Sequence, residues 1–131
     1  MEKEKKILLV SPNKNLIKSF YNNTIEKLNL PTNLKFVQLN FDYPEDAAIK
    51  NIYRILLNLK SFKTYKSVII IYPIDDIKFK YSSEEYTALN DLLCSAGLKN
   101  GISICTTALD GKLNNTMQLN IKNYLNQISR N

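Results

Sequence analysis

The chain has 131 residues and a formal net charge of +6, with 44% hydrophobic and 23% charged residues. This length and balance fit one folded domain with its own core, so we expect a single domain over residues 1–131. No apolar run approaches the roughly 20 residues that cross a bilayer, which predicts a cytoplasmic protein without membrane contact. Histidine is absent, and its absence argues against Ser-His and Cys-His catalysis and against most zinc sites.

The positive charge comes from lysines scattered along the chain. A nucleic-acid interface usually gathers its cations on one element, so we expect a solvated surface here and no nucleic-acid partner. Cys94 and Cys105 are not spaced as metal ligands. They are therefore interpreted as buried free thiols, and no metal site is predicted.

Two short segments are apolar at every position, residues 7–10 and residues 68–73, the second ending in Pro73. Such runs are typical of strands covered on both faces at the centre of a parallel sheet. Residues 34–41 and 102–105 alternate imperfectly, as edge strands do. The pattern predicts an α/β fold in which a parallel sheet of order 2-1-3-4 lies between two layers of helices.

Helix-period segments separate the strands. The first follows residues 11–15 and ends before residues 30–33, and its apolar stripe is Leu16, Phe20, Ile25 and Leu28. Capping-box spacings at Asp42 and Glu45 and at Ser82 and Glu85 begin the second and third helices. The third is expected to bury Ala88, Leu89, Leu92, Leu93 and Ala96 and to end at Gly97. The last helix has the stripe Met117, Ile121, Leu125 and Ile128.

In a sheet of this order the chain leaves the first and third strands in opposite directions, which opens a crevice beyond their carboxyl ends. Residues 11–15, 72–80 and 106–112 are expected to line it. A polar turn before a helix offers free backbone N–H groups to a phosphate. Ser11, Asn13 and Asn15 would donate and Lys14 would neutralise charge; alternatively, Ser11 or Asn13 merely caps the helix.

Four segments resemble the flavodoxin and NAD(P)H-dependent FMN reductase group: residues 11–15 as a phosphate loop, residues 72–76 with a proline at the end of the third strand, the helix that contains residues 88–93, and residues 102–111 as the last strand and loop. The resemblance implies a flavodoxin-like fold, an FMN cofactor, and electron transfer or reduction linked to NAD(P)H. The implied cofactor-binding residues are Ser11, Asn13, Lys14, Asn15, Pro73, Ile74, Asp75, Asp76, Thr106 and Thr107. The chain departs from the pattern in having no glycine in residues 11–15 and acids at 75 and 76.

Other interpretations stay open for the same residues. Asp75 and Asp76 would bind a cation, repel an anion or simply be solvated. Thr106 and Thr107 would bond a flavin edge or the backbone of their own loop. Receiver domains and sugar phosphotransferase domains share the architecture, but Ser11 stands where the first has an acid and the second a cysteine. The alternative function is a non-enzymatic flavodoxin-like or receiver-like interaction domain with a degenerate site.

The fourth strand carries no charge or proline to deter pairing at its outer edge. An uncovered edge presents unpaired backbone groups, so we expect a homodimer or another protein partner there. The alternative is that residues 108–113 fold back across the edge and leave a monomer.

Overall fold

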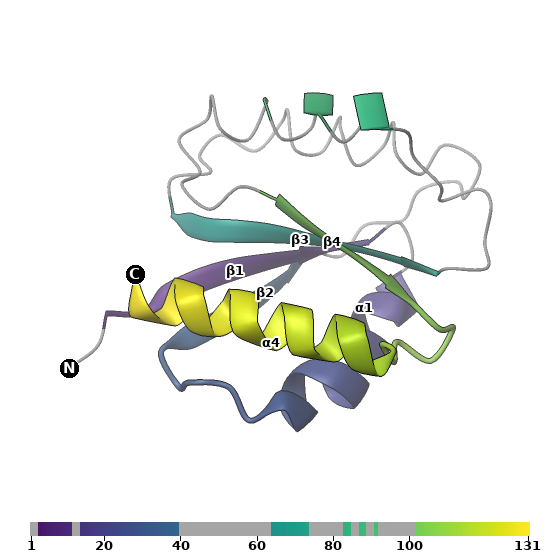
Figure 1. Cartoon of the computed structure of the whole chain (residues 1–131), viewed down its shortest axis with the longest axis horizontal. Helices are drawn as coiled ribbons and strands as arrows, with labels where there is room; N and C mark the ends of the chain where they lie inside the picture. The colour runs from purple at the N-terminus through teal and green to yellow at the C-terminus, as the bar shows by residue number, and fades with distance from the viewer. Residues whose placement is uncertain are drawn as a thin grey trace.

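Four parallel strands form the centre of the protein (Figure 1). The computed structural model describes residues 3–11, 14–39, 64–73, 83–84, 87–88, 91 and 102–131. The strands are β1 (Lys5–Val10), β2 (Leu34–Leu39), β3 (Tyr65–Pro73) and β4 (Ile102–Thr107). They lie in the order β2-β1-β3-β4, and every neighbouring pair is parallel. The predicted α/β fold with an all-parallel sheet is therefore confirmed, and the strands take the expected order.

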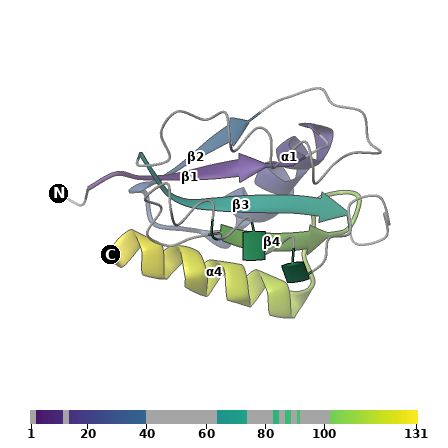
Figure 2. The ribbon, with the colours of Figure 1, turned by 90° about the horizontal axis from the view of Figure 1, so that it is seen from above.

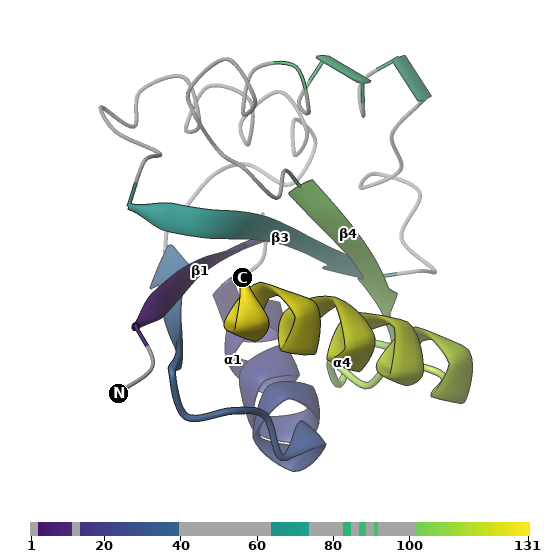
Figure 3. The ribbon, with the colours of Figure 1, turned by 60° about the vertical axis from the view of Figure 1, so that its left-hand side comes forward.

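One face of the sheet is covered by the first and last helical segments (Figures 1 and 3). The last is α4 (Asn115–Arg130), a regular helix. Asn114 caps it by accepting a hydrogen bond from the backbone N–H of Met117 at 2.8 Å, and Ile121, Leu125 and Ile128 are buried. This confirms the predicted stripe, whose four-residue and three-residue spacings keep one side of an α-helix toward the sheet.

The first helical segment was predicted as one helix but has three parts. These are α1 (Lys14–Phe20), a π-helical turn η1 (Tyr21–Ile25) and a 3-10 turn η2 (Glu26–Leu28). The apolar stripe explains the change, because Phe20 and Ile25 are five residues apart and an α-helix would not align them. Asn29 ends the segment in the left-handed region with φ of 53°, which Asn tolerates better than most residues.

The core under these helices is one continuous apolar cluster that includes residues of all four strands. Its members from the sheet are Ile7, Leu9, Leu34, Ile69, Ile71 and Cys105. Side chains at alternate positions of a strand point to the opposite face, and there Leu8, Val10, Val68 and Ile70 are at most 1% exposed. Both faces of the two central strands are therefore buried, as their unbroken apolar sequence predicted.

Three of the strands are longer than predicted. β1 begins two residues earlier than expected and β3 three residues earlier. β4 continues through Thr106 and Thr107, which were expected in a loop, because both residues pair with the end of β3. A turn follows β4, with Gly111 at φ of 80° and its N–H donating to the Ala108 carbonyl at 2.9 Å.

Some expectations fall on residues outside the described ranges. These include the second helix, Phe41, Cys94 and most of the third helix, so the three-layer sandwich stays a prediction. Ser83, Glu84, Thr87, Ala88 and Asp91 are helical, but Ala88 is exposed and its expected burial was wrong. Cys105 is a buried free thiol, as expected. Within the described ranges, no helix has the length and apolar character needed to cross a membrane.

The amino-terminal edge of the sheet is tied to the end of α4, which runs back along β4 (Figure 2). The side-chain amide of Asn33 donates to the carbonyl of Lys3 at 3.3 Å and to that of Ser129 at 3.0 Å. The backbone N–H of Lys5 donates to the Asn33 carbonyl at 2.8 Å. One asparagine thus joins β1, the start of β2 and the C-terminus of α4 at the edge opposite the predicted crevice.

Candidate functional site

The carboxyl edge of the sheet has a step between β1 and β3. β1 and β2 end level with each other, since Val10 pairs with Leu39, and Val10 also pairs with Ile70 of β3. β3 then continues to Pro73, which pairs with Thr107 of β4. Three residues of β3 therefore extend past the end of β1, at the place where the strand order reverses, because β1 leads to β2 on one side along the sheet and β3 leads to β4 on the other. In parallel α/β sheets this is where ligands bind.

The segment after β1 enters this step. Ser11 directly follows β1 and is 1% exposed, while Asn15 is exposed and Lys14 is the first residue of α1. Ser11 and Asn15 both have interaction partners within the fold. Asn13 lies outside the described residues. Because Ser11 is buried, its hydroxyl is poorly accessible to a ligand phosphate.

The ends of β3 and β4 divide the remaining candidates between the two faces of the sheet. Pro73 and Thr107 are register partners on the face of α1 and α4, and both are buried. Thr107 Oγ1 donates to the carbonyl of Ala108 at 2.8 Å, so this hydroxyl bonds its own loop, which was one of the two interpretations. Ile74, Asp75 and Asp76 lie outside the described residues.

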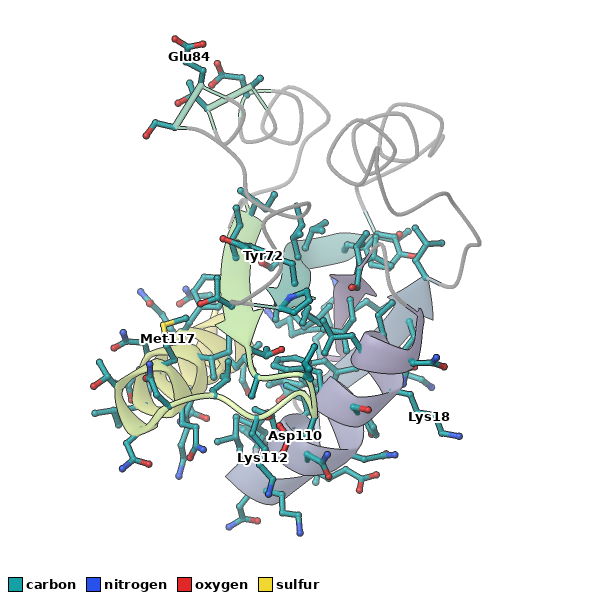
Figure 4. The ribbon with its side chains drawn as sticks, turned by 90° about the vertical axis from the view of Figure 1, so that its right-hand side faces the viewer. Lys18, Tyr72, Glu84, Asp110, Lys112 and Met117 are labelled. Carbon is teal, nitrogen blue, oxygen red and sulfur yellow. The ribbon has the colours of Figure 1, made fainter. Side chains whose placement is uncertain are left out.

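Thr106 points to the opposite face, together with its register partner Tyr72. Both side chains are half-buried. Figure 4 looks onto this edge and shows Tyr72 well apart from Asp110 and Lys112. Tyr72 was expected to line the crevice but was not among the predicted cofactor-binding residues, because only the register of β3 against β4 places it beside Thr106. The two-residue period of a strand gives the face of Tyr72 but not its neighbour.

The charges beside this edge are exposed and weakly coupled. Lys112 Nζ lies 3.9 Å from Asp110 Oδ2, and the two side chains are 64% and 53% exposed. Pairs of this kind contribute little to stability. Across the described residues no group of three Cys, Asp or Glu is placed to hold a metal ion. The described part of the edge therefore offers hydrogen-bonding and aromatic groups to a ligand.

Cys105 is close to the site in sequence but is not a nucleophile at neutral pH. Burial raises the pKa of its thiol from 9.0 to about 12, against a smaller lowering by a hydrogen bond with Ser103. Only a thiolate attacks or binds metal efficiently. The side chain belongs to the apolar cluster beneath α1 and α4, and we assign it to packing.

Elsewhere in the described part of the chain, a hollow of about 400 Å³ that is open to solvent is lined by Ser83, Glu84, Thr87, Ala88 and Asp91. All five side chains are exposed. The carboxylates of Glu84 and Asp91 would repel a phosphate group. This hollow therefore does not suit the cofactor that the sequence suggested, and the step between β1 and β3 is the better candidate for it.

The chain was compared with protein-family models, with curated proteins and with solved structures. None of the three comparisons finds a match.

Proposed function

We propose that the protein is a flavodoxin-like domain that binds a phosphate-bearing small molecule at the step between β1 and β3, and that FMN is this molecule. FMN would bind without a covalent bond and would supply the redox chemistry of electron transfer linked to NAD(P)H. The chain itself would hold the phosphate, orient the ring and limit its contact with water. The single observation that supports the site is the step, because it coincides with the divergence of the connections.

Two groups of residues would contact the ligand, one at its phosphate and one at its ring. The phosphate would lie at residues 11–15, where Lys14 supplies a positive charge. The ring would lie toward Tyr72 and Thr106, whose side chains share the face away from α4. Aromatic side chains stack favourably on flat rings, and a threonine hydroxyl both donates and accepts hydrogen bonds. Thr107 is not assigned to the ligand because its hydroxyl already bonds Ala108.

The direct test is titration of the protein with FMN, followed by the visible absorption spectrum and the flavin fluorescence. Binding should quench the fluorescence and shift the absorption bands at micromolar FMN. Riboflavin is the matched control ligand, because it has the same ring without the phosphate and should bind more weakly. If FMN at tens of micromolar changes neither signal, the flavin proposal is wrong.

Neighbouring threonines give a matched pair of variants. Thr106→Val should weaken FMN binding several-fold and leave the melting temperature nearly unchanged, because this side chain is half-buried at the end of a strand. Thr107→Val should lower the melting temperature and leave FMN affinity nearly unchanged, because it removes the bond to Ala108. The reverse pattern would assign the ligand to the other face of the sheet.

Lys14→Glu tests the phosphate end separately. The reversed charge should weaken FMN binding more than riboflavin binding, with a small change in melting temperature because a charge at the first residue of a helix contributes modestly to stability. Equal losses for the two ligands would show that Lys14 does not contact the phosphate.

The alternative function is a protein-interaction domain, and one observation favours it. β4 is the last strand of the sheet, it carries no charged residue, and Ser103 and Ile104 are only half-buried. A neutral edge strand is suited to pairing with a strand of a second copy or of another protein. Sedimentation at micromolar concentration tests this, since Ile104→Lys should shift a dimer to monomer. A monomer in both forms would argue against a homodimer at this edge.

A further inference from the structure

The loop between β4 and α4, residues 108–113, lies directly on the first helical segment and is called the strap below. Its backbone touches the end of α1, where a Cβ atom added to Gly111 would stand 2.6 Å from Ser19 C and 2.7 Å from Phe20 Cα. Gly111 also has φ of 80°, which a glycine adopts without steric cost. Only a residue without a side chain fits this contact.

Two hydrogen bonds join the strap to the π-helical turn. Thr24 Oγ1 donates to the carbonyl of Gly111 at 2.7 Å, and Asn23 Nδ2 donates to the carbonyl of Asp110 at 2.7 Å. Thr24 is 2% exposed, so without this bond its hydroxyl would be buried next to the core. Both bonds fall within η1, the part of the segment that departs from α geometry.

The strap is itself a rigid structure. Its N–H and carbonyl groups bond within the loop, from Ala108 N to Lys112 O at 3.0 Å and from Gly111 N to Ala108 O at 2.9 Å. The backbone N–H of Lys112 donates to Asp110 Oδ1 at 3.1 Å. Leu113 is buried in the core cluster. Such a loop moves as one body, so both of its bonds to η1 form or break together.

The alternative to the observed winding of residues 21–28 is a continuous α-helix. An α-helix turns about 100° per residue, so it would place Thr24 about 40° from Phe20 around the helix axis. Ile25 would then lie about 100° away from Thr24, toward the side of the helix. The π turn winds less per residue, which brings Ile25 into the core cluster and moves Thr24 to the side where the Gly111 carbonyl accepts its proton.

We propose that the strap is a conformational device that selects between these two windings. With the strap docked, residues 21–25 form the π turn. With the strap lifted, Thr24 loses its acceptor and the segment rewinds as α-helix. The strap follows Thr106 and Thr107 in the chain, so a ligand or partner that moved this loop would turn the helix and shift its connection to β2. The device does not depend on FMN being the ligand.

The backbone hydrogen bond of Glu26 reports the winding. Its N–H donates to the carbonyl of Tyr21, five residues back, and also to that of Thr24, whereas an α-helix would use Asn22, four residues back. NMR couplings across hydrogen bonds, measured between the amide nitrogen of Glu26 and the carbonyl carbons of Tyr21 and Asn22, distinguish the two states without any ligand.

The informative variant is Thr24→Val. It removes the donor to Gly111 and offers an apolar group that the α winding would place about 40° from Phe20 around the helix axis. The unmodified chain should show the coupling to Tyr21, and Thr24→Val should show the coupling to Asn22 in at least half of the molecules. Gly111→Ala should have the same effect, because its methyl group would push the strap away from α1. If Gly111→Ala does not fold, Asn23→Ala replaces it, because this substitution removes the bond to Asp110 without adding volume. Thr116→Val, at an exposed threonine in the first turn of α4, is the matched control.

The proposal is overturned if folded Thr24→Val and Asn23→Ala keep the Tyr21 coupling alone, since the π turn would then be fixed by the segment itself. It is also overturned if the unmodified chain shows only the Asn22 coupling. A shift to Asn22 in Thr24→Val but not in Thr116→Val supports it, because the two substitutions remove the same hydroxyl and differ in the contact with the strap.

Discussion

The two helical segments on the same face of the sheet obtain their form in different ways. α4 is 16 residues long, begins at a side-chain cap on Asn114 and presents one regular apolar stripe. The first segment changes winding twice within 15 residues, passing from α to π to 3-10. The five-residue spacing of Phe20 and Ile25 favours a change of winding after Phe20, and the strap contacts the backbone at the same point.

The difference shows where the information for each helix lies. The cap and the stripe of α4 are local, so this helix is specified by residues within a few positions of each other. Residues 21–25 instead combine a local apolar spacing with two hydrogen bonds to carbonyls of a loop that lies 87 positions away in sequence, and in our proposal this distant contact selects the winding. Three pairs of substitutions and one pH dependence, described from the largest expected effect to the smallest, test this contrast.

The largest effect is expected from core truncation. Leu125 is fully buried and Ile25 is 4% exposed. Leu125→Ala should reduce the free energy of unfolding by about 4 kcal/mol, because α4 is regular and the cavity cannot collapse. Ile25→Ala should cost less, roughly 2–3 kcal/mol, because in our proposal the segment can rewind and partly fill the cavity. Urea unfolding of both variants measures this, and a larger loss for Ile25→Ala would show that the first segment is as fixed as α4.

The next effect concerns backbone conformation. Gly111 and Asn29 both have positive φ, but only Gly111 packs against another backbone. Gly111→Ala should cost about 3 kcal/mol, from the unfavourable φ and the displaced strap. Asn29→Ala should lower the free energy of unfolding by about 1 kcal/mol, because alanine adopts the left-handed conformation less easily than asparagine. The same denaturation experiment compares them, and equal losses would mean that the strap contact contributes nothing.

The third effect is a pH dependence from Cys105, which lies under both helices. Its pKa is about 12 when folded, above the ordinary 9.0. Between pH 9 and 12 the thiol therefore stays protonated in the folded state but loses its proton in the unfolded state. The free energy of unfolding is thus highest below pH 9 and falls as the pH rises from 9 toward 12. The slope is about 1.4 kcal/mol per pH unit. Unfolding of the wild type between pH 8 and 10, relative to Cys105→Ala, measures it. A constant difference would contradict the burial of the thiol.

The smallest effect concerns the side-chain cap at the start of α4. Asn114→Ala removes the cap of α4 and should cost about 1 kcal/mol. Asn115→Ala, at the exposed first residue of the same helix, is the control and should change stability by less than about 0.5 kcal/mol. Amide hydrogen exchange should show faster exchange at Met117 only in the first variant. Unchanged exchange there would mean that the Asn114 side chain does not hold the helix end.

The sequence was sufficient for the sheet because its signals are local and redundant. The unbroken apolar runs at 7–10 and 68–73 identify the central strands, and the weaker alternation at 34–41 and 102–105 identifies the edges. Boundaries were less accurate, since Thr106 and Thr107 join β4 through pairing with β3, which no local pattern reveals. The five-residue spacing from Phe20 to Ile25 was visible, but it was interpreted as an ordinary helix stripe.

For the candidate site, the sequence identified the edge but not the individual contacts. Chain order alone placed Ser11, Pro73 and Thr107 near the carboxyl ends of the strands, which the structure bears out for these three positions. Burial of Ser11 and Thr107 and the neighbour relation of Tyr72 and Thr106 depend on register and packing. Those properties arise only when distant strands meet, so a single sequence could not reveal them.

The dependence of η1 on the strap also has a consequence for the order of folding. Residues 14–28 leave the ribosome long before residues 108–113 during synthesis, and closing a loop of this length is slow compared with forming a helical turn. The early helix therefore forms without the strap and should be wound as plain α. It would acquire its π turn only as one of the last events, when β4 has joined the sheet and Gly111 reaches Phe20. A nascent chain truncated before β4 would thus carry a first helix whose apolar face differs from that of the finished protein.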